Sequence, residues 1–260
     1  MNSEREVVIV TGGGQSIGEA IALRSARDGY NVVVADINAE TAKETAKKVN
    51  EFGVDSLAIK TDVTKSAEIK NLISSTIERF DRVDYLVNNA GIVAGGPFWE
   101  IDESEWDRIF DVNIKGVFLC SKEAAKEMMK KKKGKIVNIA SAAGKSGRPY
   151  LSHYSAAKSA VLGFTMSAAL ELAPYNIKVN AVCPGTVDTK FWNDLNIQVG
   201  KYFNLTEGQT LVEKFTPLIP LGRPGKPEDV AGIVSFLLSK DSDFMTGQSV
   251  NITGGREIHM

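Results

Sequence analysis

The sequence predicts an α/β protein: a single domain built on a doubly wound parallel sheet of about seven strands, with helices on both faces. Three observations support this fold class. Short apolar runs such as 7–10 and 31–36 are typical of strands that are buried on both faces. Longer segments with the hydrophobic spacing of helices separate these runs. The 260 residues are enough for one large domain, and no repeat or linker-like stretch divides them.

The first half of the chain sets the alternating pattern. The runs 7–10 and 31–36 are predicted strands because they are rich in valine, which favours extended backbone. A helix follows each of them, and Gly29 and Gly53 close these two helices. The segment 56–63 is the third predicted strand.

The second half continues the alternation. Apolar residues at helical spacing predict a helix over 69–80, and a strand follows at 83–91. Asp102 and Glu105 form a capping-box-like start of a long helix that runs to Lys133. The remaining elements are strands at 135–141, 177–185 and 249–253, a helix that contains 153–164, and a helix opened by Pro227.

Composition excludes several classes of function. The formal net charge of −1 argues against general electrostatic binding of nucleic acid or of a membrane surface. Cys120 and Cys183 lie far apart and outside any metal-ligand spacing, so we expect two reduced thiols, no metal site and a cytoplasmic location. The N-terminal residues do not resemble a secretory signal, and no segment reaches the roughly 20 apolar residues of a membrane span.

The first candidate site follows the first strand, where the sequence reads TGGGQSIG over residues 11–18. In doubly wound sheets, ligands bind at the carboxyl ends of the strands. Glycines let the backbone approach a ligand closely, and the N-terminus of the next helix attracts a pyrophosphate. The segment departs from the G-x-G-x-x-G pattern, and a plain glycine-rich turn is the alternative. The predicted cofactor-binding residues here are Gly12, Gly14, Gln15, Ser16, Ile17 and Gly18.

Asp36, at the end of the second strand, strengthens the nucleotide interpretation. A carboxylate at this place can accept hydrogen bonds from an adenosine ribose and would repel a 2′-phosphate. Neither Ile37 beside it nor Gln15 in the loop supplies a cation, so the sequence predicts NAD rather than NADP. The alternative role for Asp36 is the N-cap of the following helix.

Two further strand ends complete the predicted groove. Asp62 and Val63 end the third strand, and Asp62 is placed to face an adenine amino group. Asn89, Ala90 and Gly91 end the fourth strand and offer a small surface for the rest of the nucleotide.

The second candidate site is the tyrosine–lysine pair of YSAAK. Residues four apart lie on one helix face, so Tyr154 and Lys158 point the same way. A free tyrosine has a pKa of about 10, and a neighbouring ammonium lowers that pKa by favouring the phenolate. Ser141 ends the fifth strand, and its hydroxyl could hold the substrate oxygen that exchanges a proton with Tyr154. The pair of Tyr154 and Lys158 therefore predicts proton exchange with an alcohol. The alternative is that these two side chains form an exposed pair on the protein surface.

The segments TGGGQSIG, NNAG, YSAAK and PG, with Ser141, resemble the short-chain dehydrogenase/reductase family over about residues 7–255. The resemblance implies a Rossmann fold and a homotetramer in which the long helices pack between subunits. It also implies a catalytic tetrad of Asn113, Ser141, Tyr154 and Lys158: a water-holding residue, a carbonyl-orienting residue, the acid/base, and the residue that binds the nicotinamide ribose. Pro184, Gly185, Val187 and Thr189 match family positions near the carboxamide and the phosphates.

Two departures from the family pattern stand out. Ser16 replaces the middle glycine of the usual T-G-x-x-x-G-x-G loop, and Thr253 stands where many members have aspartate. These features resemble the polyol branch of the family, the sorbitol-6-phosphate 2-dehydrogenases. The loop after the sixth strand resembles acetoin and butanediol reductases.

A long aromatic segment at 189–220 predicts a substrate lid with two short helices, and a surface flap is the alternative. His153 is expected to be a polar group on the substrate side or at an interface. Lys145, Arg148 and Lys190 are candidates for contact with a substrate phosphate. The predicted substrate residues are Ser141, Ala143, His153, Tyr154, Gly185, Phe191 and Trp192.

The combined prediction is an NAD-dependent dehydrogenase without a metal, acting on a polyol, a sugar phosphate or a short hydroxyketone. Three alternatives remain at this point. They are a 3-oxoacyl-[acyl-carrier-protein] reductase, a non-catalytic dinucleotide-sensing protein, and a methyltransferase with a similar glycine loop.

Overall fold

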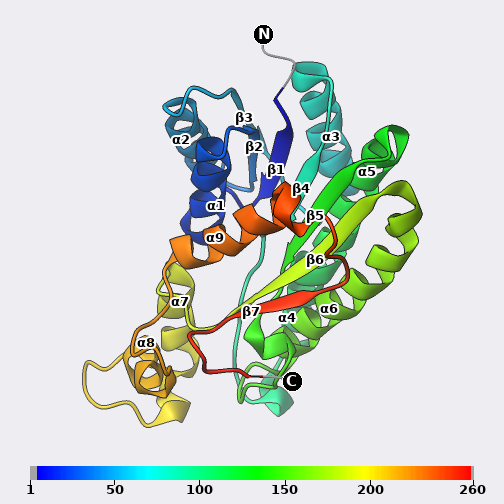
Figure 1. The fold of residues 1–260 in the computed structure, drawn as a ribbon. Coiled ribbons are helices and arrows are strands. Elements are labelled where there is room, and N and C mark those ends of the chain that lie inside the picture. Colours follow the sequence, from blue (N-terminus) through cyan, green and yellow to red (C-terminus); the bar gives the residue numbers. More distant parts are fainter. Residues whose placement is uncertain (1–4, 259–260) are drawn as a thin grey trace.

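The computed structural model describes residues 5–258, so the two ends of the predicted domain 1–260 lie outside the described range. Its centre is one sheet of seven parallel strands in the order β3-β2-β1-β4-β5-β6-β7 (Figure 1). The predicted fold class is confirmed. The strands are β1 (Val7–Thr11), β2 (Asn31–Asp36), β3 (Ser56–Lys60), β4 (Tyr85–Asn88), β5 (Gly134–Ile139), β6 (Ile177–Pro184) and β7 (Ser249–Ile252).

Nine α-helices accompany the sheet within the described residues. They are α1 (Ser16–Arg27), α2 (Ala39–Asn50), α3 (Ser66–Phe80), α4 (Glu103–Phe110), α5 (Gly116–Lys131), α6 (Ser152–Leu172), α7 (Lys190–Val199), α8 (Leu211–Phe215) and α9 (Pro227–Leu238). The segment predicted to hold two short helices contains α7 and α8, which lie beyond the carboxyl ends of the strands (Figure 1).

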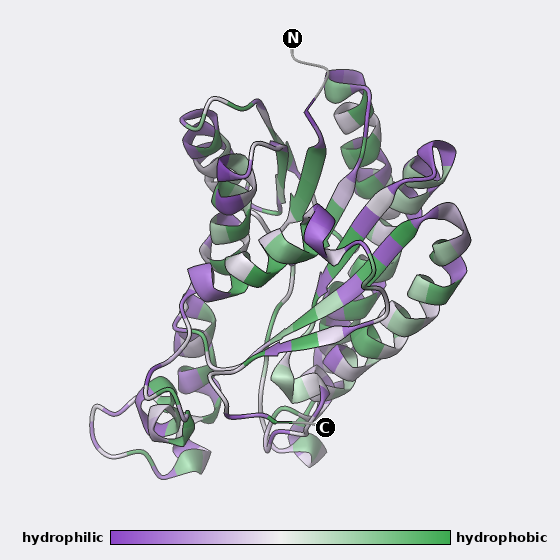
Figure 2. Ribbon diagram, in the orientation of Figure 1, coloured by the Kyte–Doolittle hydropathy of each residue, from purple (hydrophilic) through white to green (hydrophobic). Residues whose placement is uncertain are grey.

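The pleat of β1 explains why both faces of the sheet are covered. Side chains alternate along a strand, so Val8 and Val10 pack with α1, α2 and α9, whereas Val7 and Ile9 pack with α3, α5 and α6. All four side chains are fully buried. Figure 2 shows the result: the central strands are mostly hydrophobic, and the helices alternate between hydrophobic and hydrophilic residues.

The long helix predicted from Asp102 towards Lys133 forms, but a π-helical turn interrupts its α-helical hydrogen bonding. It comprises α4, a π-helical turn η2 (Asp111–Lys115) and α5. Asp102 is the N-cap residue, but its side chain makes no capping hydrogen bond. The helix ends at Lys131 because Lys132 adopts left-handed backbone, with φ of 49°. The π-helical turn carries Asn113 at its centre.

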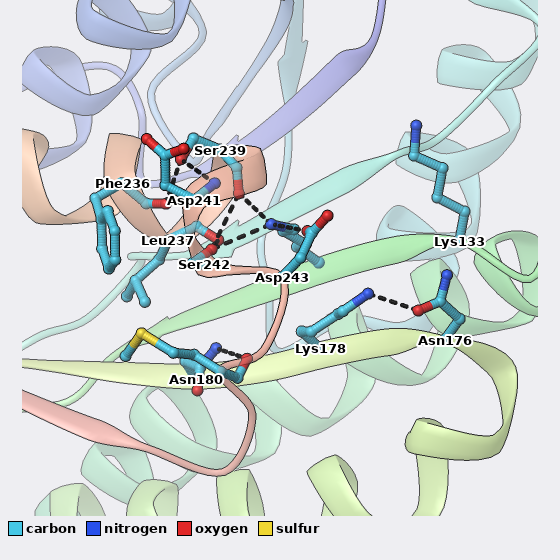
Figure 3. Close-up of polar contacts among 12 residues, drawn as sticks. Lys133, Asn176, Lys178, Asn180, Phe236, Leu237, Ser239, Asp241, Ser242 and Asp243 are labelled. Atoms are coloured by element: carbon cyan, nitrogen blue, oxygen red, sulfur yellow. Dashed lines mark hydrogen bonds and ion pairs between the residues drawn. The ribbon is translucent and has the colours of Figure 1, made fainter.

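A buried lysine fixes the chain after α9 to the amino end of the sheet. Lys135 in β5 donates hydrogen bonds to the Ser239 carbonyl and the Ser242 hydroxyl, and it pairs with the Asp243 carboxylate. Figure 3 labels these three partners and joins them by dashed lines to the Lys135 nitrogen, which carries no label. The Lys135 side chain is only 7% exposed. This cluster lies at the opposite end of β5 from Ser141, so it supports the fold rather than the candidate site.

Candidate active site

One cavity of about 940 Å³ opens at the carboxyl ends of the strands, beside the switch from β1 to β4 in the strand order. Ligands bind at this point in doubly wound sheets. The cavity is lined by all but two, Gly14 and His153, of the residues that the sequence predicts as catalytic, cofactor-binding or substrate-binding. They are Gly12, Gln15, Ser16, Ile17, Gly18, Asp36, Ile37, Asp62, Val63, Asn89, Ala90, Gly91, Asn113, Ser141, Ala143, Tyr154, Lys158, Pro184, Gly185, Val187, Thr189, Phe191 and Trp192.

The glycines of the β1–α1 turn are required by close packing. Gly12 has φ of +60°, and a Cβ there would lie 2.8 Å from the backbone of Ala90. A Cβ on Gly18 would lie 1.9 Å from the Gly12 carbonyl oxygen. Asn89 secures the turn because its amide donates to the carbonyls of Thr11 and Gly12.

The N-terminus of α1 points an uncapped helix end at the cavity. The N-cap residue Gln15 makes no side-chain capping hydrogen bond, so the first backbone N–H groups of α1 have no capping acceptor from it. Such a helix end binds phosphate groups through its N–H donors and its dipole. Ser16 holds left-handed backbone with φ of 57°, a conformation that glycine adopts more easily.

Asp36 is held rigidly at the cavity wall. Its Oδ2 accepts the Gly14 N–H at 2.9 Å, and its Oδ1 accepts the Asn38 N–H at 3.0 Å. Asn38, rather than Asp36, is the N-cap of α2. Gly14 was predicted to contact the cofactor, but it does not line the cavity; it positions Asp36 instead. Each carboxylate oxygen keeps a free lone pair for a ligand hydroxyl.

Asp62 follows β3 at the same edge of the sheet. Its Oδ1 accepts hydrogen bonds from the backbone N–H and the hydroxyl of Thr64, at 2.9 and 2.7 Å. These bonds fix the carboxylate beside Val63 at the cavity wall.

Tyr154 and Lys158 lie together in the inner part of the cavity. The Lys158 Nζ is 5.8 Å from the centroid of the Tyr154 ring and donates to the Ile139 carbonyl at 2.9 Å. Burial raises the pKa of Tyr154 to about 12, and the nearby Ser141 hydroxyl opposes this rise. Burial lowers the pKa of Lys158 to about 8.

These pKa values correct one sequence-based expectation. The adjacent ammonium was expected to lower the pKa of Tyr154, yet that pKa is raised. The physical reason is that burial disfavours the phenolate more strongly than its polar neighbours favour it. Tyr154 is therefore a protonated phenol, and a proton donor, at neutral pH.

Asn113 reaches the cavity from the π-helical turn. Its Nδ2 donates to the carbonyls of Ile92 and Ile109, at 2.9 and 3.0 Å. A Cβ on Gly91 would lie 2.8 Å from the Asn113 Oδ1 and 3.4 Å from the Lys158 Nζ, so only a glycine leaves these two groups in place. Single π-turns within helices are frequent at functional sites.

The outer part of the cavity is apolar and aromatic. Phe191 and Trp192 on α7 and Phe215 on α8 line it together with Tyr154. The ring centroids of Tyr154 and Phe191 are 5.7 Å apart. This wall suits the apolar part of a small ligand.

His153 is not at the cavity, contrary to its prediction as a substrate residue. Its side chain is fully buried, and its Nε2 lies 3.3 Å from Glu105 on α4. Adjacent residues of a helix are about 100° apart, so His153 points to α4 while Tyr154 points into the cavity. Burial lowers the pKa of His153.

The three basic residues predicted as candidates for contact with a substrate phosphate lie in different places. Lys145 donates to the Ser249 carbonyl at 2.7 Å and does not line the cavity. Arg148 lines the cavity, but its guanidinium pairs with Glu257. Lys190 lines the cavity as an exposed residue at the start of α7.

The sequence-based prediction missed residues that reach the cavity from distant parts of the chain. Arg108 of α4 is one, and no pattern distinguishes it from other helix-surface arginines. The segment after β7 contributes Arg256 and Glu257 through its return to the same end of the sheet (Figure 1). Thr61 and Thr186 are neighbours of predicted residues and could have been included by adjacency.

Two kinds of site are absent from the described part of the chain. Residues 5–258 contain no group of three or more His, Cys, Asp or Glu side chains placed to hold a metal ion. Among the same residues, no helix is long and apolar enough to cross a membrane.

Comparisons with known proteins agree with this geometry. The short chain dehydrogenase family model matches residues 6–200. A diacetyl reductase [(S)-acetoin forming] of Staphylococcus epidermidis is 41% identical over 251 residues, which are 96% of this chain and 98% of the relative. A crystal structure of NAD+-bound xylitol dehydrogenase superposes with a TM-score of 0.92 at 34% identity, covering 96% of this chain and 98% of that one.

A third similar protein has been solved with NADPH, the other nicotinamide cofactor. The crystal structure of a variant of actinorhodin polyketide ketoreductase with NADPH has a TM-score of 0.93 at 36% identity, and each chain is covered to 98%. The fold, the cavity and the family match agree: the chain belongs to the short-chain dehydrogenase/reductase family of oxidoreductases.

Proposed function

We propose that the chain is an NAD-dependent oxidoreductase that transfers a hydride between nicotinamide and a secondary alcohol or ketone. The substrate is a polyol, a sugar phosphate resembling sorbitol 6-phosphate, or a short hydroxyketone. One observation carries the proposal: the uncapped turn before α1, Asp36 and the group of Ser141, Tyr154 and Lys158 all line a single cavity.

The residues of the cavity fit a dinucleotide. The N-terminus of α1 supplies N–H donors for a pyrophosphate, and the Asp36 oxygens can each accept one more hydrogen bond from ribose hydroxyls. A buried carboxylate at this place repels a 2′-phosphate, which supports NAD over NADP. The bound nicotinamide supplies the carbon that gives or takes the hydride.

The chain's own side chains manage the substrate oxygen and its proton. In the reducing direction, the Tyr154 phenol gives its proton to the oxygen of the ketone, and the Ser141 hydroxyl orients that oxygen. The reaction leaves a tyrosinate beside the Lys158 ammonium, whose positive charge stabilises it. Asn113, fixed by its two carbonyl acceptors, places its Oδ1 near Lys158 for a water of the proton relay.

The segment 189–220 serves as the substrate lid in this proposal. Its aromatic side chains Phe191, Trp192 and Phe215 cover the outer cavity and would exclude water from the reacting groups. The hydrogen bond from the Leu211 N–H to the Asn196 Oδ1, at 2.9 Å, joins α8 to α7, so the two helices would move together.

The proposal includes a homotetramer and a cytoplasmic location. Exposed apolar side chains on α5 and α6 support self-association: Phe118, Met166 and Leu170 are 45%, 55% and 78% exposed. Cys120 and Cys183 are both free and buried, which suits a reducing compartment.

Two other functions stay as alternatives. A reductase of 3-oxoacyl groups on acyl carrier protein has the likeness to the NADPH-bound ketoreductase in its favour. The Asp36 carboxylate disfavours it, because such an enzyme would use the 2′-phosphorylated cofactor. A non-catalytic dinucleotide sensor is disfavoured by Ser141, Tyr154 and Lys158, which a sensor would not need.

The test is a substrate screen with a matched pair of tyrosine variants. Acetoin, diacetyl, xylitol, sorbitol and sorbitol 6-phosphate are assayed with each cofactor by NAD(P)H absorbance. Tyr154→Phe should abolish turnover and keep NADH binding, whereas Tyr175→Phe, on a 40% exposed residue, should leave both unchanged. Turnover that survives in Tyr154→Phe, or a wild-type chain that turns over none of these compounds, would refute the proposal.

A further inference from the structure

Arg256 is a cavity residue that the mechanism above does not use. It lies in the segment after β7 and lines the cavity. Its Nη1 donates to the Thr186 hydroxyl at 3.1 Å, and its Cζ lies 4.8 Å from the centroid of the Phe215 ring. The guanidinium is thus held between the loop after β6 and the lid helix α8.

The charge of Arg256 has no acidic partner. Within residues 5–258, no carboxylate lies at ion-pair distance from it, whereas the neighbouring Arg148 is paired with Glu257. Burial lowers the pKa of Arg256, and the charge of Arg148 adds to that effect. A partly buried cation without a counter-charge is costly, and an anion bound beside it would offset that cost.

The free edge of this guanidinium is suited to an oxyanion. Arginine carries five N–H donors in a planar fork, and the described residues accept only one side-chain hydrogen bond from Arg256. The Nε–Nη2 edge therefore remains for two parallel hydrogen bonds, the geometry that carboxylate and phosphate oxygens accept best. The contact with the Phe215 ring and the hydrogen bond to Thr186 hold the guanidinium in place.

Arg256 lies on the substrate side of the reacting groups. A series of ring contacts leads from Tyr154 to Phe191, Trp192 and Phe215, with centroid separations of 5.7, 6.3 and 6.0 Å. The guanidinium sits at the far end of this series. A substrate whose oxygen meets Tyr154 would therefore reach Arg256 with a group several atoms away, not with its reacting carbon.

We propose that Arg256 binds an oxyanion of the substrate, and that the preferred substrates are polyols or hydroxyketones that carry a phosphate or carboxylate several atoms from the reacting carbon. This inference rests on the proposed oxidoreductase function and narrows its substrate class. Of the other cavity cations, Lys158 belongs to the reacting group, Arg148 is already neutralised by Glu257, and Arg108 and Lys190 are exposed to water.

The experiment compares three compounds that share one carbon skeleton: sorbitol, sorbitol 6-phosphate and gluconate. Wild type, Arg256→Gln, Arg256→Lys and the control Lys214→Gln are assayed for kcat/KM. Lys214 precedes Phe215 on α8 and does not line the cavity. Its replacement by glutamine therefore removes the same charge from the helix that Arg256 contacts, without changing the cavity wall. Hydrogen bonds to charged groups predict a roughly 10- to 150-fold loss in Arg256→Gln for the better anionic compound.

The expected pattern is specific. Lys214→Gln resembles wild type with all three compounds. In Arg256→Gln, kcat/KM for the better anionic compound falls at least about tenfold more than kcat/KM for sorbitol, and Arg256→Lys recovers part of that difference. Comparing sorbitol 6-phosphate with gluconate shows whether phosphate or carboxylate is the recognised group. Inorganic phosphate should also inhibit turnover of acetoin competitively, and at least tenfold more weakly in Arg256→Gln, since it would occupy the same fork.

The inference and the proposed function fail differently. If neutral compounds are turned over, but neither anionic compound is preferred and phosphate inhibits wild type and Arg256→Gln equally, the role of Arg256 is refuted and the oxidoreductase function stands. If no compound reacts with either cofactor, and phosphate does not alter the thermal stability of the NADH complex in an Arg256-dependent way, both fail.

Discussion

Replacing Asp36 by asparagine should reverse or abolish the preference for NADH over NADPH that we propose for this chain. The substitution keeps the size of the side chain and removes its charge. Asp36 is 7% exposed and accepts one backbone N–H on each oxygen, so its position is fixed and its charge lies at the cavity wall. The asparagine amide can accept only one of these N–H groups, which costs both cofactors the same.

Two effects set the size of the change in cofactor preference. A carboxylate and a 2′-phosphate of charge −2 at ~5 Å repel by about 3 kcal/mol if the effective dielectric constant is ~40, between surface and water values. A charge-assisted hydrogen bond to the ribose is about 1 kcal/mol stronger than its neutral counterpart. Allowing for screening by salt, the ratio of kcat/KM for NADH to that for NADPH should fall by about 100- to 1,000-fold.

The assay measures initial rates with both cofactors on one substrate. The ratio is its own control, because a damaged loop lowers both rates together. Asp62→Asn removes the same charge one strand away and should change the ratio by less than about fivefold, since distance and water weaken the repulsion. A wild type that prefers NADPH, or an Asp36→Asn ratio within threefold of wild type, would show that the reasoning about this carboxylate is wrong.

Three further predictions concern titration and stability. Reduction needs the protonated phenol of Tyr154, whose pKa is about 12, and the ammonium of Lys158, whose pKa is about 8. We therefore expect kcat/KM for reduction to be flat below pH 8 and to fall above it. A profile that rises through pH 8 would contradict these assignments. Gly12→Ala should lower Tm by more than Gly53→Ala in differential scanning calorimetry, because both have positive φ but only Gly12 also meets backbone within 2.8 Å; equal losses would mean that the packing at Gly12 is irrelevant. Lys135→Met should lower the free energy of unfolding by about 2 kcal/mol, because the Ser239 carbonyl loses its hydrogen-bond donor. We expect Tm to fall by roughly 4–8 °C and kcat to stay unchanged. An unchanged Tm would show that this lysine does not stabilise the fold.

The fold was predictable because its signals are local. Valine-rich runs such as 31–36 identify buried strands without reference to the rest of the chain, and Gly29 marks the end of a helix in the same way. The π-helical turn at 111–115 was not predictable, because its residues have ordinary helical propensities and the turn is packed against α6, a contact that only the tertiary fold creates. Predicted strand 83–91 also shortened to β4, since its last residues leave the sheet to line the cavity.

The candidate site was predictable where each residue adjoins a strand end or shares a helix face. Asp36 and the pair of Tyr154 and Lys158 belong to this group, and all three line the cavity. His153 was misplaced because helical periodicity gives the direction of a side chain but not the element that packs there. Arg256 was missed because only the tertiary fold brings the segment after β7 to the substrate side.

The burial of Tyr154 and Lys158 also bears on the direction of catalysis. Burial favours the neutral form of each group, yet both pKa values, about 12 for Tyr154 and about 8 for Lys158, lie above 7, so both groups keep their protons at neutral pH. Tyr154 holds its proton and Lys158 is still charged, which is the state that reduction of a ketone consumes. Oxidation of an alcohol needs the opposite state, a tyrosinate, and forming it in this buried site at neutral pH requires positive charge beside it. Lys158 gives part of that charge, and a bound oxidised nicotinamide carries more. In the proposed mechanism, oxidation would therefore depend on the charge of the cofactor, whereas reduction would draw on a phenol that is already protonated.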